Sequence, residues 1–178
     1  MEGFEISGIP SEGGVLIVAD HASNHLPDDI DLGISPEFLD DHIAYDPGTA
    51  PIARIMTEKS GYLAVLSTTS RLVVDLNRYP DEASVIPVRS DGVEIPGNQL
   101  SAEEREGRMA RFFHPYHDRI DSLIADLKPA LVLSLHSFTP TLRTDPQLVR
   151  PWDIGILYNH YETASRFALQ FLEQEGAL

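Results

Sequence analysis

The stretch 13–25 reads GGVLIVADHASNH, in which five apolar residues at 15–19 are followed at once by a polar loop that begins Asp20-His21. A short, continuous apolar run is typical of a buried strand in a parallel sheet, because helices cover both faces of such a sheet. The runs 62–66 (YLAVL) and 130–135 (ALVLSL) have the same character, and the second also leads into a histidine, His136. We therefore expect three buried strands, two of them followed by histidine-containing loops.

Helical patterns separate these runs. Residues 49–59 carry Ile52, Ile55 and Met56 on one helical face. Ser101 and Glu104 form a capping-box pattern that opens a helix reaching at least Phe112. Ser35-Pro36 also resembles a helix start. Two more helices are expected, one at 116–127, with Ile120, Leu123, Ile124 and Leu127 on one face, and one at 163–173.

The remaining segments complete the prediction of the fold. Residues 154–158 (IGILY) are a further strand candidate, and 79–99 is expected to be a long ordered loop. Strands that alternate with helices indicate an α/β fold. We expect three layers, with a mostly parallel or mixed sheet flanked by helices, in a single domain spanning 1–178.

Composition excludes several classes of function. With 28 acidic and 13 basic residues the formal net charge is −15, which disfavours nucleic acid as a partner but allows a small anionic substrate bound by local arginines. The chain has no cysteine, so disulfides and thiolate metal ligands are excluded. No signal peptide or membrane span is evident, and we expect a cytoplasmic protein.

The segment 70–78, SRLVVDLNR, surrounds another apolar run with charged and amide groups. Residues 72–74 predict a short buried strand, and Arg71, Asp75, Asn77 and Arg78 lie at its ends. Arginine matches a carboxylate with two parallel hydrogen bonds, so this segment could recognise an anion. An internal arginine–aspartate ion pair explains the same pattern equally well, and the segment alone leaves both interpretations open.

Polar residues follow three of the expected strands, and ligands of open α/β sheets bind at the carboxyl ends of strands. His21 and His136 together with Asp20, Asp41 or Asp46 could hold a catalytic zinc ion, while a structural hydrogen-bonding role for each histidine is the alternative. The sequence contains no GxSxG, Walker A or GxGxxG motif. The HPYH stretch at 114–117 either joins the site or caps and packs a helix.

Seven segments resemble the N-formylglutamate amidohydrolase family, in the same order and over nearly the whole chain. They are VADHASNHLP (18–27), DHIAYDPGTAPIA (41–53), SRLVVDLNR (70–78), IPGN (95–98), FFHPYHDRI (112–120), LSLHSFTP (133–140) and RPWDIGILY (150–158). The resemblance implies a zinc carboxypeptidase-like α/β fold (phosphorylase/hydrolase-like), shared with aspartoacylase and succinylglutamate desuccinylase.

The resemblance also implies roles for individual residues. His21 and His136 match the two histidine ligands of the metal, and Arg71, Asn77 and Arg78 match the substrate-carboxylate clamp that Asp75 orients. Asn24 occupies the position of the ligating glutamate of the relatives, so we expect Asp46 to be the third ligand and place Asn24 and Ser137 with the substrate-binding residues. The alternative is that Asn24 caps a helix and no metal binds.

The implied function is a metal-dependent hydrolase, with Zn²⁺ or another divalent ion, that cleaves the amide of a small N-acyl acidic amino acid such as N-formylglutamate, as in histidine degradation. The family's general-base glutamate is expected beyond Leu178, in a chain truncated relative to the family. Two alternatives remain, a catalytically inactive module that senses an acidic metabolite and a serine or metal-free amidase. Metal content and the effect of chelators distinguish them.

Overall fold

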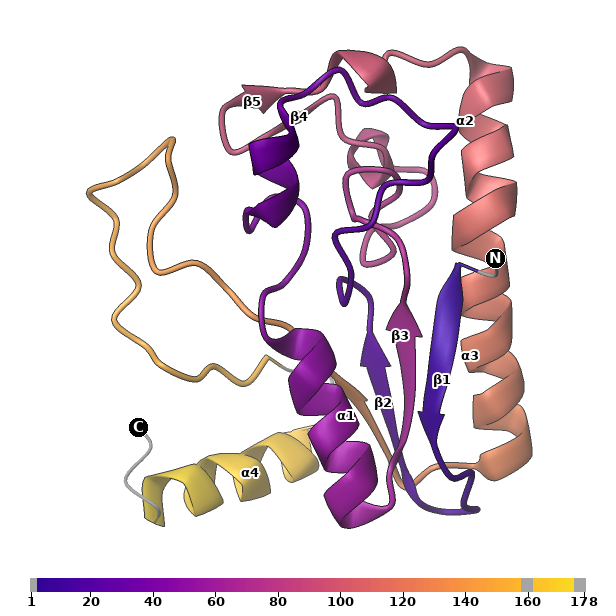
Figure 1. The fold of residues 1–178 in the computed structure, drawn as a ribbon. Coiled ribbons are helices and arrows are strands. Elements are labelled where there is room, and N and C mark those ends of the chain that lie inside the picture. The colour runs from indigo at the N-terminus through magenta and orange to yellow at the C-terminus, as the bar shows by residue number, and fades with distance from the viewer. Residues whose placement is uncertain (1–2, 158–161, 175–178) are drawn as a thin grey trace. The chain divides into compact units, whose positions relative to one another are not determined.

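The computed structural model describes residues 3–157 and 162–174 (Figure 1). The chain forms two compact units, Met1–Phe138 and Thr139–Leu178. The first unit holds the sheet and every residue assigned above to a metal or substrate. The single domain expected from the sequence stays a prediction.

A four-stranded mixed sheet forms the centre of the first unit. It consists of β1 (Phe4–Gly8), β2 (Val15–Ala19), β3 (Leu63–Ser67) and β6 (Leu131–Ser134), in the order β1-β3-β2-β6. β2 pairs in parallel with both β3 and β6, whereas β1 runs antiparallel to β3 (Figure 1). The three parallel strands are those predicted, and β1 is an additional edge strand that we did not predict.

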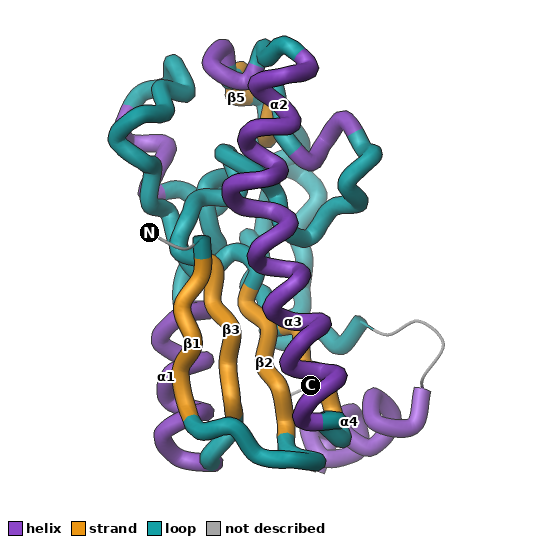
Figure 2. Tube along the Cα trace, turned by 90° about the vertical axis from the view of Figure 1, so that its right-hand side faces the viewer, coloured by secondary structure: helices purple, strands orange, loops and turns teal. Residues whose placement is uncertain are grey.

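Helices cover both faces of the sheet, which confirms the layered α/β class. α1 (Thr49–Ser60) packs on one face, and a continuous helical stretch formed by α2 (Ala102–Arg108), a π-helical turn (Met109–Phe113) and α3 (His114–Leu127) runs along the other (Figures 1 and 2). Side chains alternate accordingly along β2. Leu16 and Val18 join the core beneath α3, while Ile17 and Ala19 join the core beneath α1.

Three details of the predicted packing are wrong. Ile52 and Ile55 are half exposed, and α1 instead buries the small residues Thr49, Ala53 and Thr57. In α3, Leu123 is buried and Ile120 and Leu127 pack beside it, but Ile124 is 38% exposed. The run 130–135 predicts a buried strand, but β6 lies at the edge of the described sheet, and Leu131 and Val132 are substantially exposed.

The predicted strand at 72–74 is also wrong, because this segment forms turns. β3 ends at Ser67, and the backbone N–H of Val73 donates to the carbonyl of Ser70. Ser70 Oγ accepts from the N–H of Leu72 and donates to the carbonyl of Ala44. Leu72, Val73 and Val74 are nevertheless buried, since they fill the core above the strand ends. A short apolar run does not distinguish a buried strand from a buried turn.

The long loop expected at 79–99 is ordered and contains only short elements. These are two 3₁₀ turns, Ala83–Val85 and Pro96–Asn98, and a small ribbon of β4 (Arg89–Ser90) and β5 (Val93–Glu94). The helix start at Ser35 opens a 3₁₀ turn, Pro36–Asp40, in which the Ser35 side chain makes no capping hydrogen bond. By contrast, the capping box of Ser101 and Glu104 is present with both of its hydrogen bonds.

The second unit contains α4 (Glu162–Gln174), which confirms the helix predicted at 163–173. Residues 154–157 form no strand, and Tyr158, the last residue of that predicted strand, lies outside the described residues. Among the described helices, we find none with the length and apolar character needed to cross a membrane.

Candidate metal and substrate site

The carboxyl ends of β2 and β6 place two histidines side by side. Because these strands are parallel neighbours, with Val18 opposite Ser134, the residues that follow them emerge at the same edge of the sheet. His21 follows β2 by two residues and His136 follows β6 by two, and their ring centroids lie 5.0 Å apart. The convergence expected from the sequence is therefore present.

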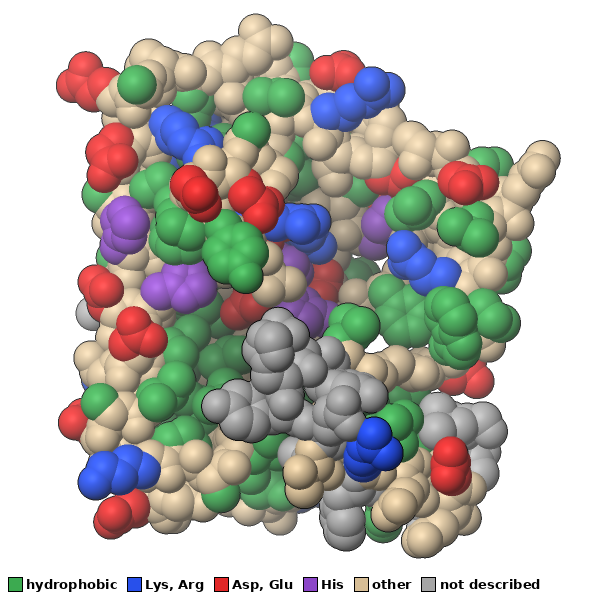
Figure 3. Space-filling model, turned by 180° about the vertical axis from the view of Figure 1, so that it is seen from behind, with side chains coloured by type: hydrophobic (Ala, Val, Ile, Leu, Met, Phe, Trp, Pro, Cys, Tyr) green, Lys and Arg blue, Asp and Glu red, His purple; other side chains and the backbone are tan. Residues whose placement is uncertain are grey.

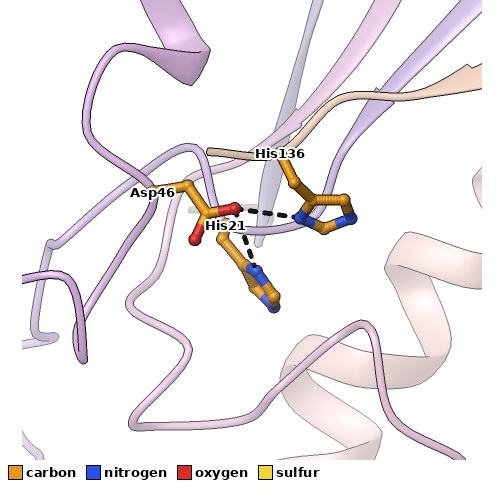
Figure 4. Close-up of side chains that lie close together, drawn as sticks. All are labelled: His21, Asp46 and His136. Carbon is orange, nitrogen blue, oxygen red and sulfur yellow. Dashed lines mark hydrogen bonds and ion pairs between the residues drawn. The ribbon is translucent and has the colours of Figure 1, made fainter. Parts of the chain in front are cut away.

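Asp46 completes this cluster from the loop that precedes α1. Its backbone N–H donates to the carbonyl of His21 at 2.9 Å, and its own carbonyl accepts from Thr49 at the start of the helix. Gly48, with φ of 88°, lets the chain turn sharply between the two. The carboxylate is thereby aimed between the imidazoles (Figure 4).

Both histidines direct Nδ1 toward one oxygen of Asp46 (Figure 4). Asp46 Oδ2 lies 2.9 Å from His136 Nδ1 and 3.5 Å from His21 Nδ1. A potential ligand atom of each of the three residues lies within 4.8 Å of those of the other two. Zinc bonds of about 2.0–2.1 Å at tetrahedral angles separate ligand atoms by roughly 3.3 Å, so small adjustments would accommodate the ion.

The far side of the His21 ring bonds to a second carboxylate. His21 Nε2 donates to Asp75 Oδ1 at 2.7 Å, since a carboxylate can only accept. His21 is 1% exposed, and its buried Nδ1 makes no well-formed hydrogen bond, only the 3.5 Å contact to Asp46 Oδ2. In the neutral ring this nitrogen carries a free lone pair directed at the cluster, which is what a metal ligand requires.

Charges in the cluster shift pKa values strongly. Burial alone would lower the pKa of His21, but the nearby carboxylates of Asp46 and Asp75 outweigh burial and raise this pKa above 6.5. Burial would raise the pKa of both carboxyls, yet the histidines and Arg71 reverse the effect. The pKa of Asp75 falls to about 2, and that of Asp46 lies well below its ordinary value. Both aspartates are therefore ionised at neutral pH.

Asp75 also binds the arginine of the predicted clamp. Its Oδ2 accepts from Arg71 Nε at 3.2 Å and from Arg71 Nη2 at 2.6 Å, and its Oδ1 accepts from the N–H of Asn77. Arg71 thus forms the internal ion pair that was one of the two interpretations of this segment, and its Nη1 lies 3.6 Å from Asp46. Arg78 is less engaged: its Nε lies 3.7 Å from Asp75, and its side chain is 49% exposed.

Of the other predicted substrate-binding residues, Asn77 and Ser137 lie beside the metal cluster, whereas the Asn24 side chain bonds elsewhere. Asn77 Nδ2 lies 3.4 Å from His136 Nε2, and the backbone N–H of Ser137 donates to Asp46 Oδ2 at 3.2 Å. Asn24 instead donates from its side chain to Asp40, in the 3₁₀ turn that follows. Ser137 therefore contributes its backbone amide rather than its hydroxyl to the described contacts.

Two residues of the HPYH stretch support the site from α3. Tyr116, which is fully buried, donates from its hydroxyl to Asp20 at 2.7 Å, and His117 Nε2 lies 3.0 Å from the carbonyl of Leu76. Asp20, one of the three candidate metal carboxylates in the sequence, thus accepts from a tyrosine, and its other oxygen lies 3.6 Å from His136 Nε2. Asp41, another of the three, pairs with His42. The HPYH pattern is visible in the sequence, but the contacts of Tyr116 with Asp20 and of His117 with Leu76 are not, because they depend on how the helix is rotated.

Comparisons with known proteins agree with this architecture. The model of the N-formylglutamate amidohydrolase family matches residues 13–177. The solved structure of a gene product from Agrobacterium tumefaciens is 34% identical, with a TM-score of 0.90 over 97% of this chain and 70% of that one. That of N-formylglutamate amidohydrolase from Ralstonia eutropha is 17% identical and shares the fold, with a TM-score of 0.64 over 78% of this chain and 58% of that one.

No curated protein matches the chain. The family match spans most of the chain and includes every residue of the metal cluster and of the 70–78 segment. The chain therefore belongs to the N-formylglutamate amidohydrolase family and is a hydrolase.

Proposed function

We propose that this hydrolase is metal-dependent and that His21, Asp46 and His136 hold Zn²⁺ or another divalent ion. The substrate is a small N-acyl acidic amino acid, with N-formylglutamate as the first compound to test. The observation that carries the proposal is the convergence of both histidine Nδ1 atoms on Asp46, with His21 Nδ1 buried 3.5 Å from that carboxylate and in no well-formed hydrogen bond.

The donor set fits a catalytic zinc site. Two imidazole nitrogens and a carboxylate are a common zinc ligand set, and three protein ligands leave a fourth position open. Asp75 holds His21 through Nε2, in the carboxylate–histidine arrangement that orients metal ligands. When bound, the ion would polarise the amide carbonyl and lower the pKa of a water molecule to about 7.

Arg78 and Arg71 supply the positive charge for the substrate carboxylates. The acidic surplus of the chain is scattered over the surface, as the red side chains on the face shown in Figure 3 illustrate, so a local cation has to attract an anionic substrate. Arg78 offers its half-exposed guanidinium, while Arg71 offers only Nη1, which lies 3.6 Å from Asp46 and is not bonded to Asp75. The Asn77 amide lies beside His136, where it can hydrogen-bond the substrate, while the Ser137 N–H donates to Asp46 and holds this ligand in place.

The test is a formate-release assay on a series of N-formyl and N-acetyl amino acids with acidic, neutral and basic side chains. The zinc-loaded chain should release formate from N-formylglutamate fastest, a chelator should abolish the activity, and added zinc should restore it. Activity that survives complete removal of the metal would refute metal dependence. A preference for neutral or basic side chains would refute the proposed role of the arginines.

A further inference from the structure

His136 has polar groups on both sides of its ring, and only one side faces the proposed metal. Nδ1 lies toward Asp46, whereas Nε2 lies 3.0 Å from Ser134 Oγ, 3.4 Å from the Asn77 amide and 3.6 Å from Asp20 Oδ2. For Nδ1 to bind a metal, Nε2 has to carry the proton. The groups around Nε2 therefore influence whether His136 is ready to act as a ligand.

Among these groups, the carboxylate is the one that favours a single state of the ring. A hydroxyl both donates and accepts, and a side-chain amide presents a donor on one end and an acceptor on the other, so Ser134 and Asn77 tolerate either tautomer. A carboxylate only accepts. The charge of Asp20 consequently favours a proton on Nε2. Asp46 competes for that proton in the metal-free site, because its Oδ2 lies 2.9 Å from Nδ1, so a group that favours the proton on Nε2 helps to free Nδ1 for the metal.

Tyr116 fixes the orientation of the Asp20 carboxylate. Its hydroxyl donates to Asp20 Oδ1 at 2.7 Å, which leaves Oδ2 facing His136. Asp20 is 7% exposed and Tyr116 is 0% exposed, so water competes little for either group. The Tyr116 ring is held edge-on against Phe4 and His117. Asp20 thus lies beside Nε2 of His136, and Tyr116 on α3 holds Asp20 in place.

The shape of the helix explains why Tyr116 reaches this position. The π-helical turn Met109–Phe113 inserts an extra residue between α2 and α3, and such turns often occur at functional sites. Because of this extra residue, the side chains of α3 point in different directions from those that an uninterrupted helix would give them. Phe112 and Phe113 enter the core, and Tyr116 points its hydroxyl toward the end of β2.

We propose that Asp20 and Tyr116 are positioning residues for the metal site: Tyr116 orients Asp20, and Asp20 holds His136 with Nδ1 toward His21 and Asp46. This inference rests on the proposed metal-dependent function. It assigns a role to the HPYH stretch that goes beyond helix packing, and neither residue is one of the proposed metal ligands.

The experiment compares zinc affinities of the full chain and its variants, measured by competition with a chromophoric chelator. Asp20→Asn should weaken zinc binding about 10–100-fold, the range usual for groups that support metal-binding histidines. Tyr116→Phe removes only a hydroxyl and leaves the charge of Asp20 in place. We expect it to weaken zinc binding by a smaller factor, at least roughly threefold, because its effect passes through Asp20.

Tyr62→Phe is the matched control, because Tyr62 directly precedes β3 at the end of the sheet opposite the site. The unfolding temperature of each metal-free variant shows whether the substitution weakens the fold itself or affects only the orientation of His136. If Tyr116→Phe lowers the unfolding temperature but binds zinc as tightly as the parent, the residue is structural and the inference is wrong. Unchanged zinc affinity in Asp20→Asn would also overturn it. A parent chain that binds no zinc would refute the proposed function, and this inference with it.

Discussion

His21 Nε2 donates to Asp75 Oδ1 at 2.7 Å, while the other oxygen of Asp75 accepts two hydrogen bonds from Arg71. One buried carboxylate therefore joins a proposed metal ligand to an arginine of the proposed substrate clamp. In this arrangement, an anion that draws Arg71 away from Asp75 would also change the charge that His21 experiences. Metal binding and substrate binding are thus expected to be energetically coupled through Asp75.

Replacing Asp75 with asparagine should weaken both the metal site and the fold. The amide of Asp75→Asn would retain an acceptor for His21 but lose the charge that pairs with Arg71. We expect zinc affinity to fall about 10–100-fold, and the free energy of unfolding of the metal-free chain to fall by up to roughly 3–5 kcal/mol, the cost of breaking a buried ion pair. Chelator competition and urea unfolding measure the two effects.

Asp29→Asn is the matched control for this substitution, because Asp29 pairs with Arg111 at the exposed surface. It should leave zinc affinity unchanged and stability nearly so. If Asp75→Asn behaved like this control in both measurements, Asp75 would have no role in orienting His21.

The two arginines of the 70–78 segment should respond differently to substitution by alanine. Arg71→Ala leaves Asp75 without its cation, so it should destabilise the chain as well as impair turnover. Arg78→Ala removes a half-exposed group, so it should cause little loss of stability. It should raise KM by tenfold or more, because a hydrogen bond from a charged group to the substrate contributes about 1.5–3 kcal/mol. Arg89→Ala, in an exposed pair with Glu94, is the control. Unchanged KM in Arg78→Ala would exclude Arg78 from substrate binding.

The stability of the metal-free chain should depend on the protonation of His21. Its pKa is raised above 6.5 on folding, so its protonation stabilises the fold fully below pH 6.5, and this contribution is lost as the pH rises through the folded-state pKa. Zinc affinity should increase over the same range, because the metal has to displace the proton. Urea unfolding and chelator competition at several pH values measure both trends.

His21→Gln should remove the alkaline loss of metal-free stability that His21 causes. If this variant and the parent lost the same free energy between pH 6.5 and more alkaline pH, the titrating group would be elsewhere in the chain.

Asn98 should be important for the conformation of the 70–78 segment. Its side-chain amide donates to the carbonyls of Leu72 and Pro87 at 2.8 and 2.7 Å, and its oxygen accepts from Arg108. Asn98→Ala leaves these buried partners unsatisfied, at a cost of about 1–3 kcal/mol. Urea unfolding should show this loss, whereas Gln99→Ala, at the exposed neighbouring position, should not. Equal stability of the two variants would contradict the structural role of Asn98.

Much of the fold was predictable from local patterns. The apolar runs before His21 and His136 are parallel neighbours in the sheet, and the capping box at Ser101 forms as expected. The convergence of His21 and His136 followed from a general rule about strand ends. Asp46 was singled out from three candidate carboxylates only through the family resemblance, and the structure places its carboxylate between the histidines.

The parts that could not be predicted depend on tertiary contacts. Residues 72–74 carry a strand-like pattern. In the structure, however, the N–H of Leu72 donates to the Ser70 side chain and its carbonyl accepts from the Asn98 side chain, whereas in a sheet both groups would bond to a neighbouring strand. The partnership of Tyr116 with Asp20 joins residues 96 positions apart and depends on the π-helical turn. The burial of Ala53 rather than Ile52 in α1 depends on how closely the helix approaches the sheet. None of these has a signal in local sequence.

The most direct test of the account is the zinc content and zinc affinity of the purified chain and of three histidine variants. His21→Gln and His136→Gln each remove a ligand, and His25→Gln removes an exposed histidine from the same loop as His21. We predict about one tightly bound zinc ion per chain in the parent and in His25→Gln, and loss of that ion in the other two. A parent chain without zinc, or a His21 variant that retains zinc at full affinity, would contradict the proposed metal site.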